Sequence, residues 1–168
     1  MRGFTLIEII VVIAIMSAMF AFLFVNFRGK DNIRFLDNKA NTILSDLQRL
    51  QTMSLSGELV NGLSPKYYFL RFSGCDSGCS NYQLEAKMPD NLEVIIENVA
   101  LARILITIVQ GAPTGAVDIN FYPPRGTIKI SSDEDLLVLK IAHLTNNLIF
   151  KYIKINSVSG RLDISPNQ

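Results

Sequence analysis

An uninterrupted apolar run near the amino terminus limits what this chain can fold into. From Phe4 to Phe27 the sequence reads FTLIEIIVVIAIMSAMFAFLFVNF, and its only charged residue is Glu8. A helix needs about 20 such residues to cross a hydrocarbon core of roughly 30 Å. A cleaved secretory signal has a shorter apolar stretch, and a buried core helix would need partners on every side. The run therefore predicts one membrane-spanning helix over residues 4–27.

The composition of the chain excludes several classes of function. It has 168 residues, which suits one domain, and its 16 Lys and Arg nearly balance its 15 Asp and Glu. No strong overall field is present to attract nucleic acid. The single histidine, His143, and the two cysteines, Cys75 and Cys79, are too few to suggest a zinc or iron enzyme. Because the sequence also lacks a nucleophile motif and a phosphate-binding loop, we expect no cofactor, no metal and no catalytic site.

The segment after Arg28 continues as a helix with one apolar face. Its apolar residues recur at steps of three and four, at Ile33, Leu36, Ala40, Ile43, Leu44, Leu47 and Leu50. Gly57 is a natural end for such a helix. The pattern predicts one helix from about Phe4 to about Ser56, with an amphipathic second half. That half could form a coiled coil, but packing on a sheet is favoured because strand-like sequence follows.

From Pro65 onward the apolar pattern alternates, which is typical of strands with one buried face. The expected strands are Lys66–Phe72, Tyr82–Lys87, Leu92–Glu97, 117–122, 127–131, Leu136–Leu144, Leu148–Asn156 and Arg161–Ser165. The segment Ala100–Val109 is compatible with either a strand or a short helix. The sequence thus predicts an α+β protein, in which a long N-terminal helix packs on an antiparallel β-sheet head within residues 28–168.

The string Gly3-Phe4-Thr5-Leu6-Ile7-Glu8, placed directly before the apolar run, resembles the N-terminal motif of type IV pilins and pseudopilins. The resemblance implies a leader over residues 1–3, which a prepilin peptidase removes by cutting between Gly3 and Phe4. It also implies methylation of the new amino terminus at Phe4. The charges beside the span leave its orientation open, but the family places the leader in the cytoplasm. We therefore expect a single-pass protein of the inner (cytoplasmic) membrane, with its head in the periplasm or outside the cell.

Glu8 is the residue to which this resemblance assigns a role in assembly. A carboxylate within a membrane helix costs about 2.5–3.5 kcal/mol and normally has a partner. The amine of Phe4 on a neighbouring subunit would neutralise it and set the stagger between subunits. The alternative is that Glu8 lies near the interface and reaches water. The implied partners are other pilins or pseudopilins in a hetero-oligomeric filament, the prepilin peptidase, the inner-membrane assembly platform and membrane lipid.

Two segments of the head resemble the GspH/FimT branch of minor pseudopilins. Residues 120–126, NFYPPRG, look like its strand and glycine turn, and residues 152–164 look like its closing hairpin. The resemblance implies a minor subunit that initiates or caps a filament of a type II secretion system or type IV pilus. Members that bind DNA can carry Gly-Arg-x-Arg in the closing turn. Here Gly160 and Arg161 match, but Asp163 replaces the second arginine, repels phosphate and can pair with Arg161. Arg161 is left as a weak candidate contact, and nucleic-acid binding is disfavoured.

The cysteines lie in the segment Cys75-Asp76-Ser77-Gly78-Cys79, which the family resemblance places outside the cytoplasm. A disulfide is the default there, and half of a metal site is the alternative. Two further functions stay open at this point. The chain could be a DNA-binding tip pilin, or a membrane-anchored head with an unknown ligand whose N-terminal motif is coincidental.

Overall fold

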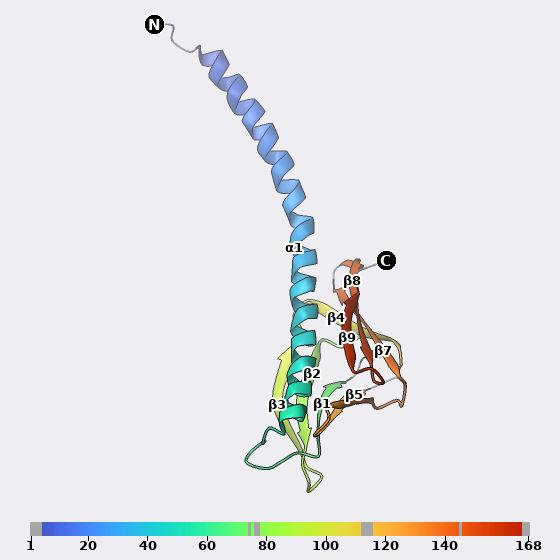
Figure 1. Cartoon of the computed structure of the whole chain (residues 1–168). Helices are drawn as coiled ribbons and strands as arrows, with labels where there is room; N and C mark the ends of the chain where they lie inside the picture. Colours follow the sequence, from blue (N-terminus) through green and yellow to red (C-terminus); the bar gives the residue numbers. More distant parts are fainter. Residues whose placement is uncertain (1–4, 74, 76–77, 112–115, 145, 166–168) are drawn as a thin grey trace. The chain divides into compact units, whose positions relative to one another are not determined.

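The computed structural model describes residues 5–73, 75, 78–111, 116–144 and 146–165. The chain begins with one long helix, α1 (Leu6–Ser56), and continues with the strands β1 to β9 (Figure 1). It divides into two compact units, residues 1–35 and 36–168, and α1 contributes to both. The two units are therefore described separately. The domain limits expected from sequence, 1–3, 4–27 and 28–168, remain predictions.

A recognisable sequence signal marks each end of α1, one where the helix starts and one where it stops. Thr5 precedes its first residue, Leu6, and Gly57 follows its last residue, Ser56. Gly57 has a φ of 65°, and the Glu58 N–H donates to Met53 O at 3.1 Å. This is a Schellman motif, in which a left-handed glycine lets the chain leave the helix while pairing one of its last carbonyls. The predicted end of the helix near Ser56 is confirmed.

The strands form two antiparallel sheets. The five-stranded sheet has the order β3-β2-β1-β5-β6 and contains β1 (Tyr67–Phe72), β2 (Asn81–Lys87), β3 (Glu93–Ala100), β5 (Val117–Tyr122) and β6 (Thr127–Ile130). The four-stranded sheet has the order β4-β7-β8-β9 and contains β4 (Ile104–Gln110), β7 (Leu136–His143), β8 (Asn146–Asn156) and β9 (Arg161–Ser165). Every neighbouring pair in both sheets is antiparallel.

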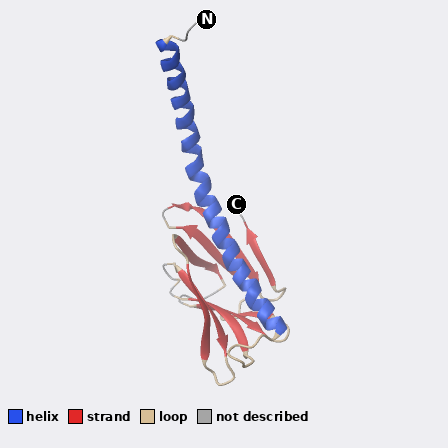
Figure 2. Cartoon of the chain, turned by 90° about the vertical axis from the view of Figure 1, so that its left-hand side faces the viewer, coloured by secondary structure: helices blue, strands red, loops and turns tan. Residues whose placement is uncertain are grey.

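The core of residues 36–168 lies between the second half of α1 and the strands. Figures 1 and 2 both show this part of the helix running alongside the sheets. The helix buries six apolar side chains at helical spacing, namely Leu36, Ala40, Ile43, Leu47, Leu50 and Met53. Polar groups also link this part of the helix to the strands. The Tyr82 hydroxyl donates to Asp46 Oδ2 at 2.5 Å, and Arg49 pairs with Glu97 at 2.8 Å. The amphipathic pattern of the sequence is thus explained by packing on sheet.

The predicted α+β fold, with a helix followed by antiparallel strands, is confirmed. The structure adds that the strands divide between two sheets. It also resolves the ambiguous segment Ala100–Val109, most of which forms β4. Strand β4 pairs with β7 from Ile104 opposite His143 onward, so a partner distant in sequence decides its conformation.

Candidate assembly site at the start of the helix

Thr5 and Glu8 hold each other at the start of α1. The Thr5 backbone N–H and the Thr5 hydroxyl both donate to Glu8 Oε2, each at 2.9 Å. In return, the Glu8 N–H lies 3.4 Å from Thr5 Oγ1 and 3.1 Å from Thr5 O. This is a capping box, in which the residue before the helix and the carboxylate three positions later satisfy donors that the helix cannot pair. The Glu8 carboxylate is thereby turned back toward the amino terminus.

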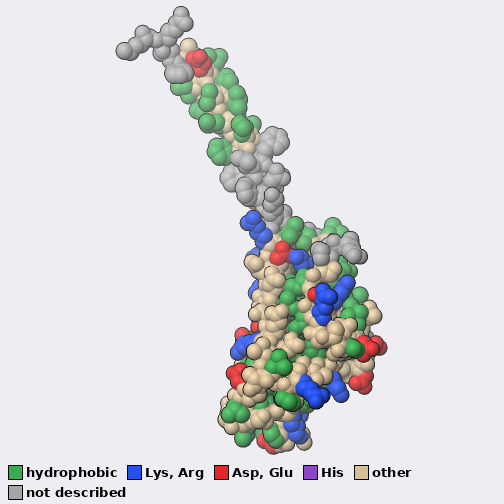
Figure 3. Space-filling view, viewed as in Figure 1, with side chains coloured by type: hydrophobic (Ala, Val, Ile, Leu, Met, Phe, Trp, Pro, Cys, Tyr) green, Lys and Arg blue, Asp and Glu red, His purple; other side chains and the backbone are tan. Residues whose placement is uncertain are grey.

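An apolar surface surrounds this carboxylate. Every side chain from Leu6 to Ala21 is exposed, and Figure 3 shows hydrophobic side chains covering the described start of the helix. Glu8 is the only charged residue of this stretch. The Ser17 hydroxyl donates to Ile13 O at 2.8 Å, so its donor is satisfied within the helix itself. The stretch therefore presents one carboxylate near its start and apolar side chains on all sides.

Two of the predicted site residues, Gly3 and Phe4, lie outside the described residues, and the cleavage and methylation assigned to them stay predictions. Among the helical residues that the structure describes, no helix is both long and apolar enough to cross a membrane. The span predicted over residues 4–27 is therefore not confirmed.

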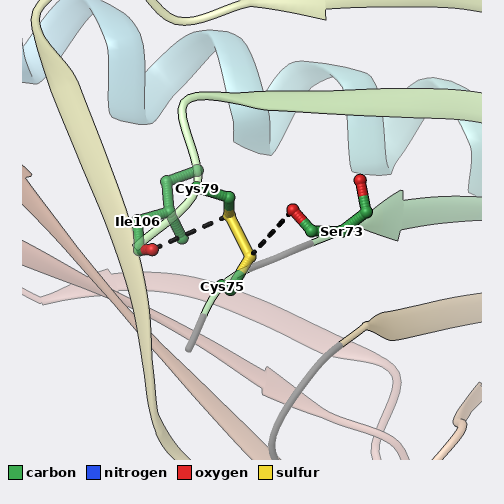
Figure 4. Close-up of a disulfide and its surroundings, with 4 residues drawn as sticks. All are labelled: Ser73, Cys75, Cys79 and Ile106. Atoms are coloured by element: carbon green, nitrogen blue, oxygen red, sulfur yellow. Dashed lines mark hydrogen bonds between the residues drawn. A yellow bond between two sulfur atoms is a disulfide. The ribbon is translucent and has the colours of Figure 1, made fainter. Parts of the chain in front are cut away.

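The two cysteines lie together in the head. The Cys75 and Cys79 sulfurs are 2.10 Å apart, as a disulfide requires, and both residues are buried (Figure 4). Cys79 Sγ also contacts Ile106 O at 3.7 Å, and Cys75 Sγ lies 4.0 Å from Ser73 O. This pair is the one for which the sequence predicts a disulfide. The bridge lies among strands of the head and belongs to its architecture rather than to the N-terminal site.

The candidate DNA contact is occupied by a carboxylate of its own hairpin. Arg161 Nε lies 2.6 Å from Asp163 Oδ2, which confirms that these two side chains can pair. Asp163 also stands opposite Lys154 across the β8–β9 pair. The Arg161 side chain is 74% exposed, so water weakens the ion pair, but the carboxylate still lies where a phosphate would have to bind.

The remaining titratable residues of the head do not assemble into a reactive cluster in the described ranges. His143 is buried at the end of β7. Residues 133–135, Asp-Glu-Asp, form part of an exposed turn beside Ser157, whose N–H donates to Asp135 O at 2.9 Å. No group of three or more His, Cys, Asp or Glu side chains that could hold a metal ion is found among the residues described.

Sequence reasoning missed two polar arrangements. One is the role of Thr5, although the spacing Thr-x-x-Glu before an apolar helix is a known sign of a capping box. The other is a charge cluster around Arg71, which holds Asp118 through two 2.9 Å hydrogen bonds and Glu93 through a third, and lies 3.5 Å from the buried Glu85. These four residues come from four strands, β1, β5, β3 and β2. No local sequence signal could have revealed which strands pair.

Comparison with known proteins gives one match. A family model described as the prokaryotic N-terminal methylation motif matches residues 1–24. No curated protein matches the chain, and no solved structure does. The matched segment contains Thr5, Glu8 and the apolar stretch that follows them. The motif marks a structural rather than a catalytic class of protein, which agrees with the expectation that the chain is not an enzyme. The match supports a type IV pilin-like protein.

Proposed function

We propose that this protein is a minor pilin or pseudopilin subunit of a type II secretion or type IV pilus-like filament. It is cut after Gly3, methylated on Phe4, anchored in the inner membrane by residues 4–27 and joined to other subunits through Glu8. Its partners are other pilins in a hetero-oligomeric filament, the prepilin peptidase, the inner-membrane assembly platform and lipid. The motif over residues 1–24 supports this proposal but covers a small part of the chain.

The observation that carries the proposal is a single carboxylate on an otherwise apolar helix surface. Exposure of the aliphatic side chains of residues 6–21 to water is unfavourable. A contiguous apolar surface of this extent marks a contact with a membrane or another protein. In such surroundings the charge of the Glu8 carboxylate is unfavourable in free energy unless a positively charged group pairs with it. Each subunit cut after Gly3 supplies one such charge, the amine of Phe4.

The capping box prepares Glu8 for this partner. Thr5 engages Oε2 only, and Oε1 makes no hydrogen bond to the residues that the structure describes. An amine from a neighbouring subunit can therefore approach Oε1 without displacing Thr5. Because the carboxylate is already turned toward the amino terminus, less side-chain freedom is lost when the pair forms.

The head supports assignment to the GspH/FimT branch of minor pseudopilins, with a role in initiating or capping the filament. Its β5–turn–β6 segment and its β8–β9 hairpin occupy the two places where the sequence resembles that branch. A DNA-binding role is the less favoured alternative, because Asp163 pairs with Arg161. A membrane-anchored head that binds an unknown ligand would have no need for a cut amino terminus, so processing separates it from the proposal.

Processing is therefore the first test. When the chain is expressed in membranes together with a prepilin peptidase, intact mass should show loss of Met1-Arg2-Gly3 and addition of one methyl group at Phe4. Replacing Gly3 with leucine should leave uncut protein, because the junction then carries a bulky side chain. Arg2→Gln is the matched control and should still be cut. A wild-type protein that keeps Met1 in the presence of active peptidase would refute the proposal.

A further inference from the structure

Strand β4 forms one border of the four-stranded sheet, and part of its outer side is closed by the other sheet. Its inner side pairs with β7, where Ile106 stands opposite Ile141. On its outer side, the Ile106 N–H donates to Cys79 O at 2.9 Å, and the Cys79 N–H donates to Ile106 O at 2.9 Å. Cys79 belongs to the connection between β1 and β2, two strands of the five-stranded sheet. These two hydrogen bonds therefore join one sheet to the other.

The residues beside Cys79 extend this closure. The Leu101 N–H donates to Ser80 O at 2.7 Å, and Leu101 O accepts from the Ile104 N–H at 3.4 Å. The outward-pointing amides of Ile104 and Ile106 are thus both paired within the chain. An exposed strand border with unpaired amides is a template for strands of other molecules. The first half of β4 is protected from such pairing.

Gly78 fits the connection closely onto β4. It has a φ of 99°, and a Cβ built on it would lie 2.3 Å from Leu105 Cγ. A side chain at this position would therefore collide with the strand, and its backbone conformation favours glycine. The Gly78 N–H also donates to Cys75 O at 3.2 Å, which closes the turn between the two cysteines. Figure 4 shows the disulfide directly beside Ile106.

We propose that the Cys75–Cys79 disulfide is an edge lock, which holds Cys79 against Ile106, fastens the two sheets together and closes the border of β4. A bridge between residues this close in sequence restricts only a short piece of chain, so its effect is local. That piece is the one that carries both hydrogen bonds to Ile106. When the bridge is open, the turn gains conformations in which Cys79 no longer reaches the strand, and the Ile106 amide, which donates to Cys79 O, exchanges with water.

Amide hydrogen exchange of the full chain in detergent micelles tests the edge lock. Dithiothreitol reduces the bridge to two thiols, which alkylation and intact mass verify, and is itself oxidised to a cyclic disulfide. Exchange of the Ile106 amide, followed within a peptide covering residues 104–110, should become roughly thirtyfold faster after reduction, the factor expected from freeing so short a loop. A peptide covering residues 117–122, from the other sheet, is the internal control and should keep its rate.

Two variants separate the effect of the disulfide from the effect of the close packing between Gly78 and Leu105. Cys75→Ser/Cys79→Ser should reproduce the effect of reduction without a reductant. Gly78→Ala retains both cysteines but inserts a methyl group against Leu105, and it should also speed exchange of residues 104–110 while the bridge stays intact. Unchanged exchange of residues 104–110 after verified reduction would overturn the edge lock. Equal loss of protection in both peptides would overturn it as well, because the whole head would then depend on the bridge.

Discussion

The two halves of α1 contain similar side chains but place them in opposite surroundings. Ile13, in the first half, is 58% exposed, whereas Ile43, in the second half, is fully buried. In residues 6–21 apolar residues occupy almost every position, so no face of the helix is polar enough to remain in water. In residues 36–53 they recur every three or four positions, and polar residues fill the remainder. The spacing of polar residues, rather than the amount of apolar surface, therefore separates a half whose apolar side chains stay exposed from one whose apolar side chains form part of the core.

Charged groups in the two regions differ in the same way. Near the start of α1, the Glu8 side chain bonds to Thr5 of its own turn and to no other residue that the structure describes. In the head, Arg71 contacts carboxylates from three other strands of its sheet. Arg71 and its carboxylates are therefore paired within the head, whereas the carboxylate at the start of the helix is turned toward the amino terminus. This contrast agrees with the assembly contact that we propose for Glu8.

The largest effect on the stability of the head is expected when the same substitution is made in both halves. Ile43→Ala removes a fully buried side chain and should cost about 2–5 kcal/mol in the free energy of unfolding of the head. Ile13→Ala removes an exposed side chain and should leave that free energy unchanged. Urea unfolding of both variants in the same detergent, followed through the tyrosines of the head, makes the comparison. Equal losses would mean that residues 6–21 also belong to the folded core.

A smaller effect is expected from two threonines, one directly before α1 and one within it. Thr5→Ala removes the hydroxyl of the capping box and should destabilise the first turn by about 1 kcal/mol. Thr42→Ala removes a hydroxyl that only bonds back to Asn38 O, and it should cost little. The amide exchange rate of Glu8 reports on the first turn, and Thr5→Ser should restore it. No change in Thr5→Ala would show that the cap does not hold the helix start.

The smallest effect on the stability of the head is expected when the pH is lowered. Hydrogen bonds from Arg71 and then Lys87 lower the pKa of Glu93 from 4.5 to about 2. A folded-state pKa below the unfolded value stabilises the head above about pH 4.5, and this contribution is lost as the pH falls toward about 2. Because Glu93 is partly exposed, screening should limit it to about 1 kcal/mol or less. Glu93→Gln should flatten this part of the urea-midpoint profile, and an unchanged slope would contradict the charge cluster.

Glu85 should act in the opposite direction. Burial raises the pKa of Glu85, so its charge opposes folding at neutral pH and this cost is relieved as the pH falls. Glu85→Gln should therefore steepen the loss of stability in acid, measured by the same urea midpoints.

Much of the fold could be predicted from the sequence, because local patterns determine it. Strands β5 and β9 agree with the predicted ranges, since each alternates apolar and polar residues and adjoins a turn, which follows β5 and precedes β9. Strand β4 could not be assigned, because its apolar residues do not alternate regularly with polar ones and pairing with β7 decides its conformation. The division of the strands into two sheets depends on which distant strands meet, and no local pattern records that choice.

The candidate site could be predicted only in part. Glu8 is conspicuous because it interrupts an apolar run, and Cys75 and Cys79 are conspicuous because they are the only cysteines. The contribution of Thr5 depends on side-chain hydrogen bonds whose sequence sign is short and common. The contact of Cys79 with Ile106 depends on how the two sheets approach each other, and no local sequence pattern predicts that approach.

The most direct test of the account separates the charge of Glu8 from its capping role. Glutamine can replace glutamate in a capping box, so Glu8→Gln should keep the helix start, membrane insertion and processing. It cannot neutralise an amine, and breaking a buried pair of charges costs roughly 3–5 kcal/mol. Recovery of partner pilins with the tagged subunit, normalised to processed protein, should therefore fall by about a hundredfold or more. Undiminished recovery with Glu8→Gln would contradict the claim that the Glu8 charge joins the subunits.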